Sequence, residues 1–133
     1  MYNMKDEYKI GITELDRHNE RIFELLDEIY IVVTSQFYLN KFDKLQHLSS
    51  ALNDFVSYHF KCEEDCMSSI NYEKLLTQKY EHAAFLKMIS DFDIEKLKKT
   101  DAEYILYKLN ELNGWLVGHI LEQDKQITSS KCA

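Results

Sequence analysis

The stretch IFELLDEIYIVV, residues 22–33, decides the fold class of this chain. Its apolar residues Ile22, Leu25, Ile29 and Val32 recur at steps of three and four, which is the spacing of one helix face. Acidic residues fill several of the positions between them. The stretch is therefore typical of an amphipathic α-helix with one buried stripe.

Three more stripes of this kind follow along the chain. They comprise Leu45, Leu48, Leu52 and Phe55, then Phe85 and Ile89, and finally Ile105, Leu109, Leu112 and Leu116. We predict helices at roughly 17–38, 41–66, 72–90 and 101–126. Asp16 is placed to cap the first helix, and Thr100 with Glu103 resembles a capping box for the fourth.

The connections between these helices are short, so successive helices are expected to be antiparallel neighbours. Proline is absent and glycine occurs only three times, so few residues interrupt the helices. The sequence predicts an all-α, up-down-up-down four-helix bundle that forms a single domain over residues 1–133.

The composition narrows the class of protein. A chain of 133 residues with 45% hydrophobic residues can bury a proper core. Its 16 basic and 23 acidic residues give a net charge of −7, which argues against a nucleic-acid or anionic membrane partner. No stretch approaches the ~20 apolar residues that a membrane span requires. We expect a cytoplasmic protein; the oligomeric state stays open.

Each apolar stripe ends in a polar side chain that can bind metal. One or two further steps of three or four residues lead to His18 in the first helix, His59 in the second, His82 and Gln78 in the third, and His119 in the fourth. These positions lie near the starts of the first and third helices and near the ends of the others. An up-down-up-down bundle therefore brings all of them to the same end of the core.

Two carboxylates accompany the imidazoles. A single histidine on an apolar face is usually a hydrogen-bonded core residue, but convergence from four helices favours ligands. Glu63 lies one turn after His59 on the same face. Asp124 lies five residues after His119 and reaches inward if the helix end tightens or bends. Carboxylates that bridge two ions suit a pair of first-row metals, whereas a closed zinc site commonly uses cysteines.

Four runs carry a resemblance to a known family. DRH at 16–18, HFKCEEDCM at 59–67, QKYEH at 78–82 and WLVGHILEQD at 115–124 resemble the hemerythrins, in particular their bacterial branch. The resemblance implies a four-helix bundle that binds dioxygen at two non-haem iron ions, bridged by carboxylates and by an oxo or hydroxo group.

The same resemblance implies roles for individual residues. His18 and His59 match the imidazoles of the iron that binds O2, and His82 and His119 match ligands of the other iron. Glu63 and Asp124 match the bridging carboxylates. Leu116 matches the apolar residue that lines the oxygen pocket, and Trp115 matches an aromatic residue beside it.

One position departs from the family pattern. Gln78 stands where the family has the first histidine of an HxxxH pair. Its carbonyl oxygen is a weaker candidate ligand than imidazole, and its amide is equally suited to hydrogen-bond a water in that place. His47 is an improbable substitute, because it lies twelve residues before His59 and is best interpreted as a surface histidine.

The sequence leaves three functions open. The leading hypothesis is a dioxygen-binding protein that stores, delivers or senses O2, rather than an enzyme. The second is a di-iron enzyme that reacts with O2, peroxide or NO, for which Gln78 is the sole support. The third is a bundle that has lost or exchanged its metal.

Overall fold

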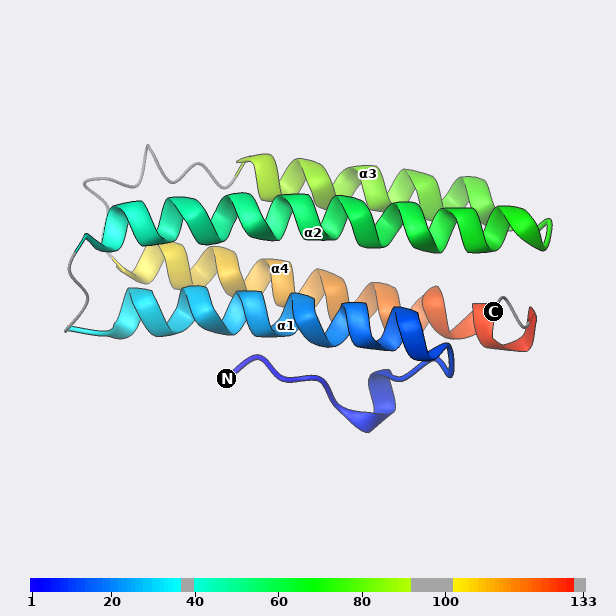
Figure 1. The fold of residues 1–133 in the computed structure, drawn as a ribbon, viewed down its shortest axis with the longest axis horizontal. Helices are drawn as coiled ribbons and strands as arrows, with labels where there is room; N and C mark the ends of the chain where they lie inside the picture. Colours follow the sequence, from blue (N-terminus) through cyan, green and yellow to red (C-terminus); the bar gives the residue numbers. More distant parts are fainter. Residues whose placement is uncertain (37–39, 92–101, 131–133) are drawn as a thin grey trace.

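A computed structural model describes residues 1–36, 40–91 and 102–130 of the chain, with side chains described up to residue 127. Its elements are η1 (Asp6–Tyr8), α1 (Thr13–Thr34), α2 (Lys41–Ser69), α3 (Leu75–Asp91), α4 (Ala102–Glu122) and η3 (Asp124–Ser130). The four α-helices form an antiparallel bundle (Figure 1). The predicted fold class is confirmed.

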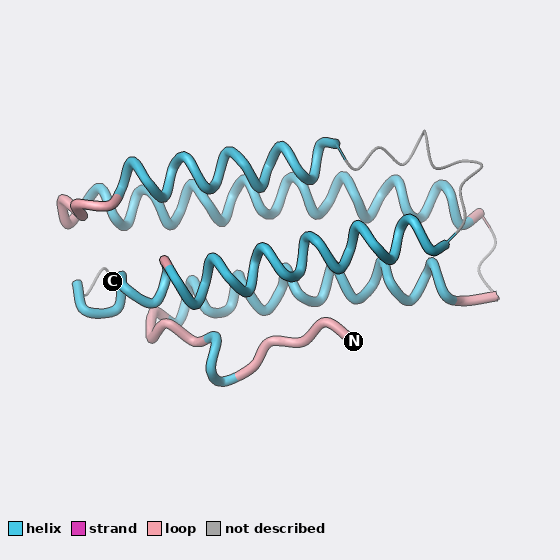
Figure 2. Tube along the Cα trace, turned by 180° about the vertical axis from the view of Figure 1, so that it is seen from behind, coloured by secondary structure: helices cyan, strands magenta, loops and turns pink. Residues whose placement is uncertain are grey.

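The helices pack in a ring. α1 contacts α2 and α4, and α3 contacts the same two helices from the other side. The start of α1, the turn from α2 to α3 and the C-terminal η3 lie at one end of the bundle (Figure 2). The structure therefore brings together the ends at which the sequence placed its metal-binding residues.

The buried stripes are nearly those predicted, since their apolar side chains are 0–8% exposed. The exception is in α2, where Phe55 is only half-buried and Val56, the next residue, is fully buried. The stripe of α2 passes from Leu52 to Val56 and then to His59.

The helix limits differ from the prediction at several ends. α1 begins at Thr13 rather than near 17 and ends at Thr34 rather than 38; residues 37–39 lie outside the described residues. α4 ends at Glu122, earlier than the predicted 126, because the chain tightens into η3. Thr100 also lies outside the described residues, so its capping box stays a prediction.

The prediction that Asp16 caps the first helix is wrong. α1 starts four residues earlier than predicted, with Ile12 at its N-cap, so Asp16 lies inside the first turn. The Asp16 carboxylate instead accepts hydrogen bonds from the backbone N–H groups of Ile10 and Gly11, at 2.8 and 3.1 Å. Gly11 has a φ of 91°, which lets the chain turn back toward this carboxylate at no steric cost.

The N-terminal segment packs onto the bundle, a feature that the helical pattern did not predict. Tyr2, Tyr8 and Ile10 are all buried. The Tyr2 hydroxyl donates to Asn110 Oδ1 on α4 at 2.7 Å, and the Tyr8 ring stacks on Phe23 of α1. In the part of the chain that the structure describes, no helix is long and apolar enough to cross a membrane.

Candidate metal centre

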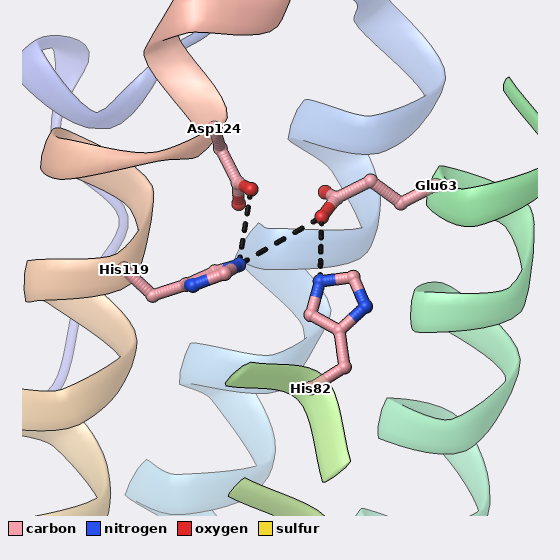
Figure 3. A group of neighbouring side chains, drawn as sticks. All are labelled: Glu63, His82, His119 and Asp124. Atoms are coloured by element: carbon pink, nitrogen blue, oxygen red, sulfur yellow. Dashed lines mark hydrogen bonds and ion pairs between the residues drawn. The ribbon is translucent and has the colours of Figure 1, made fainter. Parts of the chain in front are cut away.

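Four buried side chains from three helices and the C-terminal turn converge at one end of the core (Figure 3). Glu63 comes from α2, His82 from α3, His119 from α4 and Asp124 from η3. Their ligand atoms all lie within 4.8 Å of one another. None of these residues is more than 3% exposed, so the cluster is shielded from bulk water.

Glu63 lies at the middle of the cluster. Its Oε1 lies 3.0 Å from His82 Nε2 and 3.9 Å from His119 Nε2. Asp124 Oδ1 lies 3.1 Å from His119 Nε2 on the other side. One nitrogen from each imidazole and one oxygen from each carboxylate therefore face the same small volume.

Asp124 enters the cluster because the end of α4 changes its geometry. A continuous α-helix would place it about 140° around from His119. The backbone N–H of Gln126 donates to Gln123, a shorter step than in an α-helix, and η3 begins at Asp124. The tightened turn leaves Asp124 only 1% exposed. This is the change at the helix end under which the sequence predicts that Asp124 reaches inward.

Two further carboxylates orient the imidazoles. His82 Nδ1 lies 2.7 Å from Glu64 Oε2, and His119 Nδ1 lies 3.0 Å from Glu81 Oε1. A carboxylate that accepts the Nδ1–H keeps the proton on that nitrogen, so Nε2 is the nitrogen that a metal can bind. Each imidazole thus presents Nε2 to the cluster.

Aromatic rings fix the planes of the same imidazoles. Phe60 stacks on His82 with ring centroids 3.8 Å apart and an interplanar angle of 2°. Trp115 stacks on His119 at 4.7 Å and 11°. These contacts restrict ring rotation, so the two nitrogen donors are held in place by packing as well as by hydrogen bonds.

Several buried polar atoms at this end lack a hydrogen-bond partner. Among the described residues they belong to Asn19, His59, Glu63, Gln78 and His119. His119 Nε2 lies near Asp124 without the alignment of a hydrogen bond. Each unpaired buried group costs about 1–3 kcal/mol. Nitrogen and carboxylate donors of this kind suit a first-row metal cation, which would satisfy them.

The charges of the cluster lead to the same conclusion. Burial raises the pKa of Asp124 to about 6, with the Glu63 charge adding to the effect. Burial opposes protonation of His119, but the carboxylates of Asp124 and Glu63 outweigh it and raise that pKa to about 10. Burial also acts against ionised Glu63, yet three imidazoles, with His119 contributing most, hold its pKa well below the usual range. The cluster therefore requires positive charge, from protons or from a cation.

The histidines of α1 and α2 lie on the other side of Glu63. His59 is fully buried, and its Nε2 lies 3.4 Å from Glu63 Oε2. His18 lies further out, with Nδ1 3.2 Å from His59 Nδ1 and Nε2 3.5 Å from Glu14 Oε1. Burial and the neighbouring His59 lower the pKa of His18. The structure thus places His59 against the cluster and His18 against His59.

Gln78 is fully buried at the edge of the cluster. Its Nε2 donates to Asp124 Oδ1 at 3.1 Å, while its Oε1 has no hydrogen-bond partner. The amide therefore holds the Asp124 carboxylate and keeps one oxygen available. His47 is exposed, as predicted. Leu116 is buried and Trp115 is half-buried; their place in an oxygen pocket stays a prediction.

Three residues that support the imidazoles are not on the predicted stripes: Glu64, Glu81 and Phe60. Glu64 and Phe60 each directly follow a candidate ligand, and Glu81 precedes one. Glu81 contacts His119 on another helix rather than its own neighbour His82, so only the packing of α3 against α4 reveals its partner. The pair Glu63–Glu64 is the feature of the sequence that could have indicated a second carboxylate beside the ligands.

Fold and cluster together define a metal-binding four-helix bundle. The hemerythrin HHE cation binding domain family matches residues 10–128, and the chain belongs to the hemerythrin family. A bacteriohemerythrin of Clostridium acetobutylicum is 34% identical over 126 residues, which cover 95% of this chain and 98% of that protein. A bacteriohemerythrin of Stenotrophomonas maltophilia is 26% identical over 125 residues, covering 91% and 75%.

Two solved structures share the fold. A crystal structure of wild-type hemerythrin has a TM-score of 0.75 and 21% identity, covering 91% of this chain and 89% of its own. A crystal structure of a leucine-to-phenylalanine mutant has a TM-score of 0.82 and 20% identity, with both chains covered completely. These likenesses support the bundle and its topology.

Proposed function

We propose that this chain binds dioxygen reversibly through two non-haem iron ions at the buried end of the bundle. The observation that carries the proposal is the convergence of Glu63, His82, His119 and Asp124, whose donors approach one another in a site closed to water. Membership of the hemerythrin family and the bacteriohemerythrin relatives support the choice of iron and of O2.

Each residue has a defined task in this proposal. His82, His119 and the two carboxylates would hold the first cation, with Gln78 beside them. His59 and the remaining carboxylate oxygens would hold the second, together with a donor from α1 that the sequence assigns to His18. Ferrous iron supplies the electron density that binds O2, which no side chain offers. Burial of the site excludes the water that would otherwise compete for the ions.

The uncharged Gln78 favours a second candidate function. The first cation would have two imidazoles, from α3 and α4, and Gln78 is engaged through its amide with Asp124. A position without a third imidazole is open to exchange with small ligands. This arrangement favours a di-iron enzyme that reacts with O2, peroxide or NO.

The experiment begins with anaerobic loading of the purified protein with ferrous iron, followed by metal analysis. Admission of air is expected to produce a visible absorption change that removal of O2 reverses over repeated cycles. Less than one iron per chain, or an irreversible change in the first cycle, would refute reversible carriage. Multiple turnovers of peroxide or NO per chain would instead support the enzymatic candidate.

A further inference from the structure

Asn19 is a buried residue that neither the predicted ligand set nor the cluster includes. It is 0% exposed, and both of its amide atoms, Nδ2 and Oδ1, lack a hydrogen-bond partner. We propose that the Asn19 amide oxygen is the α1 donor to the second cation, beside His59 and Glu63. The inference rests on the proposed function, and it names the α1 residue that would complete the second cation position.

The register of α1 directs Asn19 toward the centre of the bundle. Leu15, Asn19, Ile22, Leu26 and Ile29 follow one another at steps of four and three, and none is more than 3% exposed. His18 lies about 100° around the helix from Asn19. On that side its ring meets Phe55, Tyr58 and His59 of α2. Asn19 is therefore the more central of the two, at almost the same height along the bundle.

A buried amide without a hydrogen-bond partner is unusual in the apolar stripe of a helix. Leucine or alanine would fill the same stripe without burying a polar group, and both form helices more readily than asparagine. Asn19 offers one carbonyl oxygen and two N–H groups. Since no described residue bonds either atom, a bound ion would account for a polar side chain here.

The buried atoms of α1 and α2 that lack a hydrogen-bond partner define the partner. They are the amide atoms of Asn19, with His59 Nε2 and Glu63 Oε2, which lie 3.4 Å from each other without forming a hydrogen bond. Amide and carboxylate oxygens with imidazole bind divalent first-row cations. An amide oxygen is a weaker donor than imidazole for such ions, so this position binds its cation less tightly than the four-donor cluster.

His18 then acts as a positioning residue for His59. Both of its ring nitrogens have protein neighbours, His59 Nδ1 at 3.2 Å and Glu14 Oε1 at 3.5 Å. The contact between the two Nδ1 atoms leaves His59 Nε2 directed to Glu63. In this arrangement His18 orients the imidazole, while Asn19 contributes the donor.

The test compares the full-length protein with Asn19→Leu, Asn19→His and His18→Leu. Each is stripped with a chelator, titrated anaerobically with ferrous iron, and examined by native mass spectrometry for ions bound per chain. Thermal unfolding of the metal-free proteins is followed by circular dichroism. Leucine has the same branched arrangement of side-chain heavy atoms as asparagine but no donor, and histidine replaces the amide with a stronger donor.

The wild-type protein is expected to bind two ions, the second at least tenfold more weakly than the first. Asn19→Leu should bind one ion and, without metal, unfold at or above the wild-type temperature. Asn19→His should regain the second ion with at least tenfold higher affinity, and His18→Leu should retain two.

Wild-type affinities for both ions in Asn19→Leu would overturn the inference. A single ion in the wild-type protein would overturn it as well, while leaving the first position intact. If Asn19→Leu does not fold, Asn19→His decides: failure to tighten the second site removes Asn19 from it. Absence of any iron in the wild-type protein would mark failure of the proposed function itself.

Discussion

Replacement of Glu64 by glutamine tests whether the cluster is organised to hold a cation. The Glu64 carboxylate lies 2.7 Å from His82 Nδ1, and its side chain is 26% exposed. The substitution keeps the size and an acceptor oxygen but removes the negative charge. The His82 Nδ1–H then lacks a charged acceptor and its Nε2 becomes a poorer ligand for a metal, although no atom inside the cluster changes.

The expected loss follows from this geometry. Removing a partner that orients a metal-bound imidazole typically costs 10–100-fold in metal affinity, or about 1.4–2.7 kcal/mol. Because glutamine retains an acceptor, we expect about tenfold for Glu64→Gln and up to a hundredfold for Glu64→Ala. Glu81→Gln should behave similarly, since its contact with His119 is 3.0 Å long and its side chain is 27% exposed.

The assay is anaerobic competition for the first ferrous ion against a coloured chelator of known affinity. Asp65→Asn is the matched control, because Asp65 is on the same helix and pairs with Lys61 at 3.4 Å but is 69% exposed. The control should change the affinity less than twofold. If Glu64→Gln also stays within twofold of the wild type, the carboxylate does not support His82 as a ligand.

Three further outcomes are expected. Glu63→Ala should lose at least one iron per chain by metal analysis, because the central carboxylate disappears from a buried site; unchanged iron content would contradict its bridging place. Gln78→His should slow autoxidation of the iron-loaded protein in air about tenfold by adding an imidazole, and an unchanged decay rate would show that Gln78 only fills space. Apparent affinity for the first ion should rise about tenfold per pH unit above pH 6, because binding displaces the proton of His119, whose pKa is about 10. Below pH 6 the proton of Asp124, pKa about 6, must leave too, so the rise should approach a hundredfold per unit; a flat titration from pH 5 to 8 would exclude this coupling.

The helical stripes predict the fold and much of the cluster because burial in a bundle follows residue spacing. Glu63, His82 and His119 continue the apolar stripes of their helices, so counting residues is enough to bring them together. The position of Asp124 cannot be predicted by counting residues, because its side chain points inward only where α4 ends and η3 begins.

Other features depend on distances that a pattern does not contain. His18 and Asn19 are neighbours in the sequence, and either one could continue the buried stripe of α1. Only the packed structure shows that Asn19 is fully buried and that His18 contacts α2. The bond from Gln78 to Asp124 and the contact from Glu81 to His119 each join separate helices. Their partners are set by how the helices pack, which spacing along one helix does not specify.

Asp124 lies beyond the last residue of α4, so a cation bound at the site would also help to order the segment that follows α4. Asp124 opens a short 3-10 helix, in which Ile127 is buried against Met67 of α2. A cation held by both Asp124 and His119 would clamp this helix to the bundle. Loss of the ion would leave the Ile127 contact and the hydrogen bonds from Gln78 to Asp124 and from Lys74 to Gln126 to hold this helix, so residues 123–130 would open to a protease more readily. Cleavage there would then report how much metal each molecule carries.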